Sequence, residues 1–339
     1  MSSIRNTTLL YRPSLSIWTA RKLDKAESVK VNKDNGAVEG AANVHKQLLP
    51  DSKELLSVQK WANSFRTFVY TSTSPWDDAG WRIRSAAGHM DFMAEVGDRL
   101  AEGELLVDAF VDAYMLEVVK AKVTLGYMFH QSDYPGEREV RAKFRFMIDV
   151  MPVASSEDFR IVDGGIPKEE VDRLVQLTQS SVEGRIQGAM REAYEKLYGV
   201  VAKMANTLEQ YGAGTVKKFN DSLIENIAEI VSVMPALNLT GDPHLAALAN
   251  DAKQLAAYSV IDLRKSDTVR DAAIDDARNL ATKFKGYIAA SIADDTPVQK
   301  RIHTPVVSTV HTEVPTEIMV TPSNVVNMSS KRALFADML

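Results

Sequence analysis

The stretch PKEEVDRLVQLTQSSVEGRIQGAMREAYEKLYGVVAKMANTLEQY, residues 167–211, decides the fold of this chain. From Val182 onward its apolar residues recur every three or four positions, close to the ~3.6-residue period of a straight α-helix. Pro167 suits the first turn of a helix, and Gly212 suits its end. The stretch therefore predicts one amphipathic helix, roughly 65 Å long at ~1.5 Å per residue, whose apolar stripe needs partners.

Three further segments with the same period follow, at residues 216–234, 243–263 and 269–288. Asp242 and Pro243 give the second of these segments an N-cap followed by proline at the first helical position. Because the connecting loops are short, we expect neighbouring helices to run antiparallel. The pattern predicts an elongated antiparallel helical bundle, or long helical hairpins, over residues 167–292.

The first 166 residues mix strand and helix signals. The clearest strand is KFRFMIDVMPV at 143–153, where apolar and polar side chains alternate. Shorter strand candidates lie at 14–19, 81–85 and 158–162. A strand needs neighbours, so we expect one small sheet built largely from these pieces. The predicted fold class is α+β, mainly α with a small β-sheet, and residues 1–166 are predicted to form an α+β domain.

Helices are also expected in this first part. At 51–70, Asp51 is a candidate N-cap, and an aromatic stripe that includes Trp61 follows. His89–Ala101 and Glu104–Leu125 read as two helices joined at Gly103, or as one bent helix. The polar stretch at 25–40 contains an Asn-Gly turn signal and predicts a loop or weak hairpin.

The loop TSTSPWDDAGWRIRSA at 71–86 places Asp77 and Asp78 between Trp76 and Trp81. Two carboxylates beside two indoles suggest a cation or sugar site. Adjacent Asp side chains point apart, however, and no third ligand stands at a defined spacing. We therefore expect a packed corner anchored by the two Trp side chains.

Composition limits the classes of function. The chain has 339 residues, 45% hydrophobic and 25% charged, with a net charge of −5, which is typical of a globular protein. The acidic balance argues against a general polyanion binder. Residues 1–66 carry eleven Lys and Arg against six Asp and Glu, which we read as a solvated surface. The absence of Cys excludes disulfides, thiolate catalysis and Cys-ligated zinc.

Motifs that carry chemistry are missing from the sequence. It contains no GxxxxGK[ST], no GxGxxG after a strand, no HExxH and no GxSxG. We therefore expect a protein that is not an enzyme, with no catalytic residues, no cofactor and no metal. No run approaches the ~20 apolar residues of a spanning helix, and the start of the sequence lacks a signal-peptide pattern. We expect no membrane association and a cytoplasmic location.

The last part of the sequence changes character. Residues 293–328 contain four Pro and no helical period, which predicts a flexible or extended tether. Residues 329–339, SSKRALFADML, predict a short amphipathic docking segment. Its apolar face, the expected partner-binding site, consists of Leu334, Phe335, Met338 and Leu339. The alternative is that this segment folds back onto its own bundle.

A series of motifs gives the chain a resemblance to a known family. These are the strand with Trp18 and Arg21, the aromatic helix with Trp61, the SPWDDAGW corner at 74–81, the YPG turn at 134–136, and then KFRFMIDVMPV and DFRI. With the helical second half, they resemble an uncharacterised family of phage and conjugative-element proteins. Genes of that family often sit beside a MoxR-type AAA+ ATPase and a von Willebrand A-type protein. The resemblance covers roughly residues 14–290 and implies a genomic context, in a bacterial host, rather than a mechanism.

Three functional hypotheses follow. The leading one is a non-enzymatic helical adaptor that binds a protein partner, either a AAA+ ATPase or itself as a homo-oligomer. The second is a single-stranded nucleic-acid binding or annealing protein, with a basic cluster of Arg138, Arg141, Lys143 and Arg145. The third is a structural or scaffold protein of the virion. Binding assays at low and moderate salt separate the second from the other two.

Overall fold

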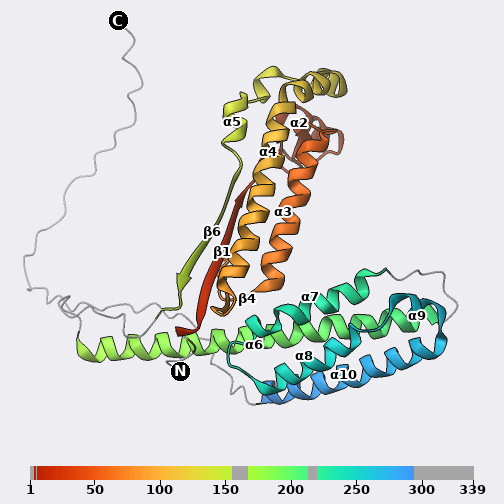
Figure 1. Ribbon diagram of the computed structural model, residues 1–339. Helices are drawn as coiled ribbons and strands as arrows, with labels where there is room; N and C mark the ends of the chain where they lie inside the picture. Colours follow the sequence, from red (N-terminus) through yellow and green to blue (C-terminus); the bar gives the residue numbers. More distant parts are fainter. Residues whose placement is uncertain (1–3, 5, 155–166, 213–219, 294–339) are drawn as a thin grey trace, which may run out of the picture. The chain divides into compact units, whose positions relative to one another are not determined.

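The computed structural model describes residues 4, 6–154, 167–212 and 220–293 (Figure 1). Residues Met1–Asp294 form one compact unit. None of the helices in these described ranges is long and apolar enough to cross a membrane. The expected strand at 158–162, the docking segment at 329–339 and all but the first residue of the tether lie outside the described residues.

An antiparallel sheet of four strands has the order β4-β5-β1-β6. Its strands are β1 (Thr8–Ser16), β4 (Ser74–Pro75), β5 (Arg82–Ser85) and β6 (Arg145–Pro152). β1 pairs with β6 from Leu9 opposite Pro152 to Ser16 opposite Arg145, and its first half pairs with β5. The predicted small sheet is confirmed, and it contains strands at the candidates 143–153, 14–19 and 81–85.

β1 begins at Thr8, earlier than the predicted start at residue 14. It contains Pro13, which has no backbone N–H and is disfavoured where a strand is paired on both sides. β5 stops pairing at Tyr11, so β6 is the only described strand beside Pro13, which it meets at Ile148. The proline is therefore tolerated inside a longer strand than the alternation alone indicated.

A second sheet pairs β2 (Arg21–Asp24) with β3 (Val44–Gln47), and helix α2 (Lys25–Asp34) lies between them in sequence. The predicted loop at 25–40 is therefore wrong for its first part. α2 has no apolar stripe, and its buried residues are Ser28 and Asn32. The Asn32 amide donates to the Ala42 carbonyl and accepts from the Ala42 N–H, at 3.0 and 2.9 Å. Polar contacts hold this helix, so apolar periodicity could not reveal it.

Helices α3 (Lys53–Ser72) and α4 (His89–Leu125) pack side by side next to the long strands (Figure 1). The N-cap of α3 is Ser52 rather than the predicted Asp51, because the Ser52 hydroxyl accepts from the Leu55 N–H at 3.3 Å. The aromatic stripe of α3 is buried as expected, and the Trp61 ring lies 4.5 Å from the Phe146 ring of β6.

α4 is one continuous helix, and Gly103 is not a joint between two helices. Gly103 is buried, and a Cβ atom built there would lie 2.3 Å from a ring carbon of Trp61. Close packing of α3 on α4 therefore explains this glycine.

The chain returns from α4 to β6 through three short elements. They are η1 (Gly126–Met128), η2 (Gln131–Asp133) and α5 (Glu137–Arg141). The Tyr134 hydroxyl, in the predicted turn, donates to the Leu48 carbonyl at 2.8 Å, and Tyr114 of α4 donates to the Pro135 carbonyl at 2.8 Å. These bonds fasten the connection to α4 and to the residues after β3.

The helical half matches its prediction closely. Its elements are α6 (Lys168–Gly212), α7 (Ser222–Leu237), α8 (Pro243–Leu255), α9 (Val260–Lys265) and α10 (Asp267–Ala293). α6 is the long helix predicted from residues 167–211, and it packs against both α7 and α10. The predicted bundle is confirmed.

The predicted helix at 243–263 is divided into α8 and α9. The division occurs where Ser259 has extended backbone and its hydroxyl accepts from the Asp262 N–H at 3.4 Å, which begins α9. Leu255 and Leu263 are both buried, so each piece keeps an apolar face on the bundle. The apolar period therefore continues across a break that the Ser N-cap creates.

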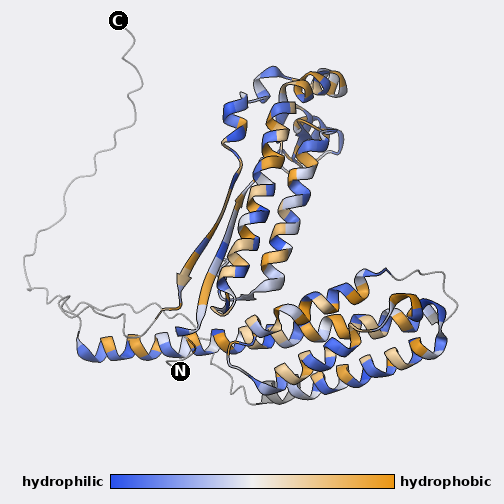
Figure 2. Cartoon of the chain, viewed as in Figure 1, coloured by the Kyte–Doolittle hydropathy of each residue, from blue (hydrophilic) through white to orange (hydrophobic). Residues whose placement is uncertain are grey.

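The core of the bundle extends into the sheet. Leu10 of β1, Ile83 of β5 and Trp76 of the corner belong to the same buried cluster as the stripe of α6. Figure 2 shows this stripe as apolar residues repeating along α6, with polar residues between them. The core therefore crosses the predicted domain boundary between residues 166 and 167.

Candidate interaction site

A groove of about 960 Å³ lies between α7 and α8. Its lining is mostly apolar and rich in alanine: Ala228, Val231, Ser232, Met234, Pro235, Asn238, Gly241, Leu245, Ala246, Ala249, Asn250, Lys253, Ala256 and Ala257. Met234 and Leu245 are buried, whereas Ala246 and Ala257 are exposed. The groove therefore has an apolar base that is open to solvent along two helices.

The turn from α7 to α8 fixes one end of the groove. The Asn238 amide donates to the Asp242 carbonyl at 2.8 Å and accepts from the Asp242 N–H at 2.7 Å. Asp242 then caps α8 by accepting from the His244 N–H at 2.8 Å. Gly241 has φ of +67°, a conformation that favours glycine. The turn is thus locally determined by its side chains.

Tyr194 of α6 ties this turn to the longest helix. Its hydroxyl donates to the second carboxylate oxygen of Asp242 at 2.6 Å. Burial is the largest cause that raises the pKa of Tyr194, and this hydrogen bond is the second. The turn at this end of the groove is therefore held by hydrogen bonds from both α8 and α6.

The lining of the groove is mostly apolar and carries few polar groups. Its small alanine side chains allow a partner backbone to approach closely, and Lys253 is the one charged residue in the lining. Apolar concave surfaces with few polar groups are typical of sites for apolar ligands and for amphipathic helices. The lining contains no carboxylate, so it offers no pair of groups for acid–base catalysis.

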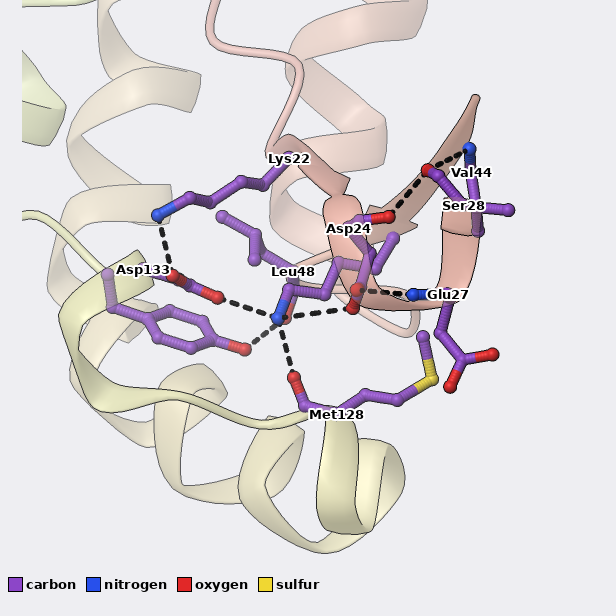
Figure 3. Close-up of polar contacts among 10 residues, drawn as sticks. Lys22, Asp24, Glu27, Ser28, Val44, Leu48, Met128 and Asp133 are labelled. Carbon is purple, nitrogen blue, oxygen red and sulfur yellow. Dashed lines mark hydrogen bonds and ion pairs between the residues drawn. The ribbon is translucent and has the colours of Figure 1, made fainter. Parts of the chain in front are cut away.

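A buried polar network lies elsewhere, around the Lys46 side chain of β3 (Figure 3). The Lys46 ammonium lies 2.7 Å from an Asp133 carboxylate oxygen and donates to the Met128 carbonyl at 2.6 Å. Asp24 lies 3.8 Å from the same ammonium, and Lys22 donates to Asp133 at 2.6 Å. These contacts fasten the β2–β3 sheet to η1 and η2.

Asp133 is the acidic centre of this network. Burial raises its pKa, but hydrogen bonds from Lys22 and Lys46 outweigh burial and hold the pKa below its ordinary value. Asp133 therefore stays ionised at neutral pH, and its stabilising effect is lost only as the pH falls through its lowered pKa. Every charged group in the cluster has a partner of opposite charge, so we assign the network a structural role.

Two cations, Lys196 of α6 and Arg82 of β5, lie at the carboxyl end of α3. The Lys196 ammonium of α6 donates to the carbonyls of Tyr70 and Thr73, both at 2.6 Å. The Arg82 guanidinium of β5 donates to the Thr73 hydroxyl at 2.7 Å and to the Thr73 carbonyl at 2.8 Å. Two cations therefore satisfy carbonyls that a helix end leaves without partners.

Burial lowers the pKa of Lys196 to about 8, and the nearby Arg82 charge lowers it further, whereas Glu192 opposes the shift. A lysine with a lowered pKa can act as a catalytic base or nucleophile. Here the ammonium faces two main-chain carbonyls rather than a cavity, and its side chain is 15% exposed. The geometry supports a fastening role between α6 and α3.

The basic cluster proposed for nucleic acid is divided by the fold. Arg138 and Arg141 lie on α5, Lys143 follows it, and Arg145 begins β6. Arg141 donates to Glu104 of α4 at 2.5 Å and to Asp108 at 3.1 Å. Arg138, Lys143 and Arg145 are exposed. Two acidic side chains of α4 thus neutralise Arg141, which is one of the four cations.

The corner with Asp77 and Asp78 is packed, as expected. Trp76 is buried, and one Asp77 oxygen accepts from the Ala79 and Trp81 N–H groups, both at 3.0 Å. Asp78 is exposed. Asp77 therefore shapes the turn, and the two carboxylates do not converge.

Within the described ranges, no group of three or more His, Asp or Glu side chains is placed to hold a metal ion. The predicted partner-binding residues Leu334, Phe335, Met338 and Leu339 lie outside the described residues. Comparison with protein-family models, with curated proteins and with solved structures found no match.

Sequence reasoning did not find the groove. It identified the stripes of α7 and α8 correctly, but it treated each stripe as core. Ala246 and Ala249 of α8 lie between the large apolar residues, and these two alanines by themselves do not indicate a groove. The groove exists because these small side chains face α7 across the turn, and this proximity is a property of the tertiary structure.

Proposed function

We propose that this protein is a non-enzymatic helical adaptor that binds an amphipathic helix of a protein partner. The observation that carries this proposal is the open, alanine-rich groove between α7 and α8. Helix-in-groove recognition buries the apolar face of one helix along such a surface. The groove offers apolar contact along two helices, and its few polar groups would fix the orientation of the partner helix.

The remaining chemistry of the described residues supports a binding role. Lys196 and Tyr194 have the pKa values that are shifted furthest among the described residues, and both side chains are engaged in structural hydrogen bonds. Neither lies in the lining of the groove. An enzyme usually places perturbed groups in a cleft, so this separation favours binding over catalysis.

The partner helix is expected to carry small or medium apolar residues at helical spacing and an acidic residue near one end. Lys253 is the one cation in the lining and would pair with that residue. The resemblance of the sequence to a phage and conjugative-element family makes a MoxR-type AAA+ ATPase the first partner to test. The adaptor would then link that ATPase to another protein.

The decisive experiment fills the groove. Ala249→Trp places a large ring in the lining, and we expect it to weaken binding to the purified ATPase at least tenfold, or ~1.4 kcal/mol. Ala247→Trp is the matched control, because Ala247 is exposed on the same helix and lies outside the lining. Binding is measured by calorimetry and by the change in ATPase rate.

Two results would contradict the proposal. Equal binding by both variants would move the partner to another surface, and no binding by the unmodified protein would remove the ATPase as partner. A salt-dependent affinity for single-stranded DNA that falls steeply between ~50 and ~200 mM salt would favour the nucleic-acid alternative instead. Stoichiometric presence in purified virions would favour the scaffold alternative.

A further inference from the structure

α4 carries apolar residues on two opposite faces. One face is buried in the protein and includes Phe110, Tyr114 and Val118. The other face is solvent-exposed, with exposed fractions of 70% for Leu105, 60% for Leu116, 63% for Val119 and 84% for Val123. Nine residues separate Tyr114 from both Leu105 and Val123, which is about half a turn beyond two full turns at ~3.6 residues per turn. A row of exposed apolar residues on one helix face is unusual unless another surface covers it.

The exposed row has the spacing of a coiled coil. Its positions are Leu105, Ala109, Asp112, Leu116, Val119 and Val123. The steps between them alternate strictly between four and three, which gives a seven-residue repeat. A straight surface helix follows ~3.6 residues per turn, whereas a repeat of 3.5 keeps one seam facing a partner helix. The pattern therefore favours a helix as the covering partner.

Charges in and beside the row identify the kind of helix that fits. Asp112 in the row and Asp108 beside it lie toward the amino end, and Lys120 and Lys122 beside the row lie toward the carboxyl end. Asp108 also accepts from Arg141, and Lys120 also donates to Glu117 at 2.7 Å. The row is thus acidic at its amino end and basic at its carboxyl end. Two copies of the row therefore place acidic groups opposite basic groups when they run antiparallel.

Position within the repeat makes this complementarity specific. Asp108, Met115 and Lys122 are seven residues apart and form one flank of the seam. In an antiparallel pair this flank faces its own copy, so Asp108 meets Lys122 and Met115 meets Met115. In a parallel pair the flank would face the other side of the seam, which holds Ala113 and Lys120, and no such acid–base pairs would form.

We propose that the exposed face of α4 binds the same face of a second copy of this chain, as an antiparallel two-helix coiled coil about a two-fold axis near Met115. An interface of this kind uses one patch twice, as closed dimers do. This inference goes beyond the proposed function, because it concerns a different helix and a different occupant from the α7–α8 groove. Asp112 would lie at the seam, where a polar residue selects one register at some cost in stability.

The first test changes the row itself. We expect Val119→Glu with Val123→Glu to raise the dimer dissociation constant at least hundredfold, measured by analytical ultracentrifugation. Both positions are mostly exposed in the single chain, so the fold is expected to persist, and circular dichroism checks this. Met90→Glu is the control, because Met90 is 76% exposed on α4 but outside the row. A protein that is monomeric at ~100 µM, or a dimer that the double variant leaves intact, overturns the proposal.

The second test determines direction, and the absence of Cys from the chain makes it clean. In the antiparallel pair, Met115→Cys lies near the axis and forms a disulfide with its copy under mild oxidation. Leu105→Cys lies roughly 30 Å from its copy, at ~1.5 Å per residue, and does not cross-link. A parallel pair would cross-link through Leu105→Cys, which lies in the seam opposite its copy, and not through Met115→Cys, and this result would contradict the antiparallel arrangement.

The third test uses charge. Asp108→Lys with Asp112→Lys makes both ends of the row basic, and Lys120→Glu with Lys122→Glu makes both ends acidic. Each variant alone is expected to be monomeric, whereas an equimolar mixture recovers dimers. No recovery in the mixture would show that the flanking charges do not select the partner. Neither pair of substitutions touches the α7–α8 groove, so a failure here leaves the adaptor proposal standing.

Discussion

Gly103 of α4 illustrates how a single residue sets the distance between two helices. The Trp61 indole occupies the space beside it, and its N–H donates to the Arg99 carbonyl at 2.9 Å, which holds the ring in place. A methyl group at Gly103 would lie 2.3 Å from a ring carbon. We therefore expect Gly103→Ala to lower the free energy of unfolding by about 1–3 kcal/mol, as overpacked cores do, measured by urea denaturation.

The same helix offers the matched control. Gly97 is exposed, and a Cβ atom there meets nothing within 4 Å. Gly97→Ala gains helix propensity without a clash and is expected to raise the free energy of unfolding by about 0.5–1 kcal/mol. If both substitutions stabilised the protein equally, the indole at Trp61 would have room to move and the close packing would not be required.

At the scale of elements, Lys196 connects α6 to the carboxyl end of α3. Its pKa in the folded chain is about 8, below the ordinary value of 10.5. Between these values the unfolded chain binds more protons than the folded chain, so the free energy of unfolding rises with pH. Below pH 8 the lysine is protonated in both states, and the rise is absent. At ~1.36 kcal/mol per pKa unit, the rise amounts to about 3 kcal/mol at most.

Lys196→Met removes the titrating ammonium and keeps most of the length of the side chain. Arg82 still donates to the carbonyls of Thr73 and Tyr70, at 2.8 and 3.3 Å, so the end of α3 remains capped. We expect the difference in stability between the two proteins to shift in favour of Lys196 from pH 8 to pH 10.5. Tyr114 and Tyr134, whose pKa values burial raises to about 12, act in both proteins and cancel in the difference. A constant difference across this range would mean that Lys196 keeps its ordinary pKa.

Elements with strong apolar periods were predictable from the sequence. α6 and β6 appear where the sequence places them, since the 3.6- and two-residue periods reflect faces that are buried. α2 was not predictable in this way, because Asn32 and Ser28 hold it through hydrogen bonds instead of apolar contacts. The break between α8 and α9 was missed because buried leucines continue the period across it.

The α7–α8 groove and the exposed row of α4 were not predicted from the sequence, for a related reason. The row that contains Leu116 and Val123 shares α4 with a stronger buried stripe, and the sequence does not say which of two apolar faces the rest of the chain covers. The α7–α8 groove depends on which helices become neighbours. A periodic pattern predicts that a face needs a partner, and only the tertiary structure shows which faces remain without one.

At the scale of the whole molecule, stability is expected to reside in Met1–Asp294. The buried clusters found among the described residues draw all their members from between Leu10 and Phe284. A variant that ends at Asp294 is therefore expected to keep its thermal midpoint within about 2 °C. For a protein of this size, ~1 kcal/mol of lost stability would shift the midpoint by roughly 2–4 °C, so differential scanning calorimetry can resolve the effect.

The full-length double variant Phe335→Ala with Leu339→Ala separates stability from binding. We expect its midpoint to match the unmodified protein, while its affinity for a protein partner falls tenfold or more, because buried apolar side chains contribute roughly 1.5–3 kcal/mol each before ordering costs. A midpoint lowered by many degrees, in this variant or in the truncation, would mean that residues 295–339 complete the core of the protein. The predicted docking role of Leu334, Phe335, Met338 and Leu339 would then be wrong, because a segment that is needed for folding is not available to a partner.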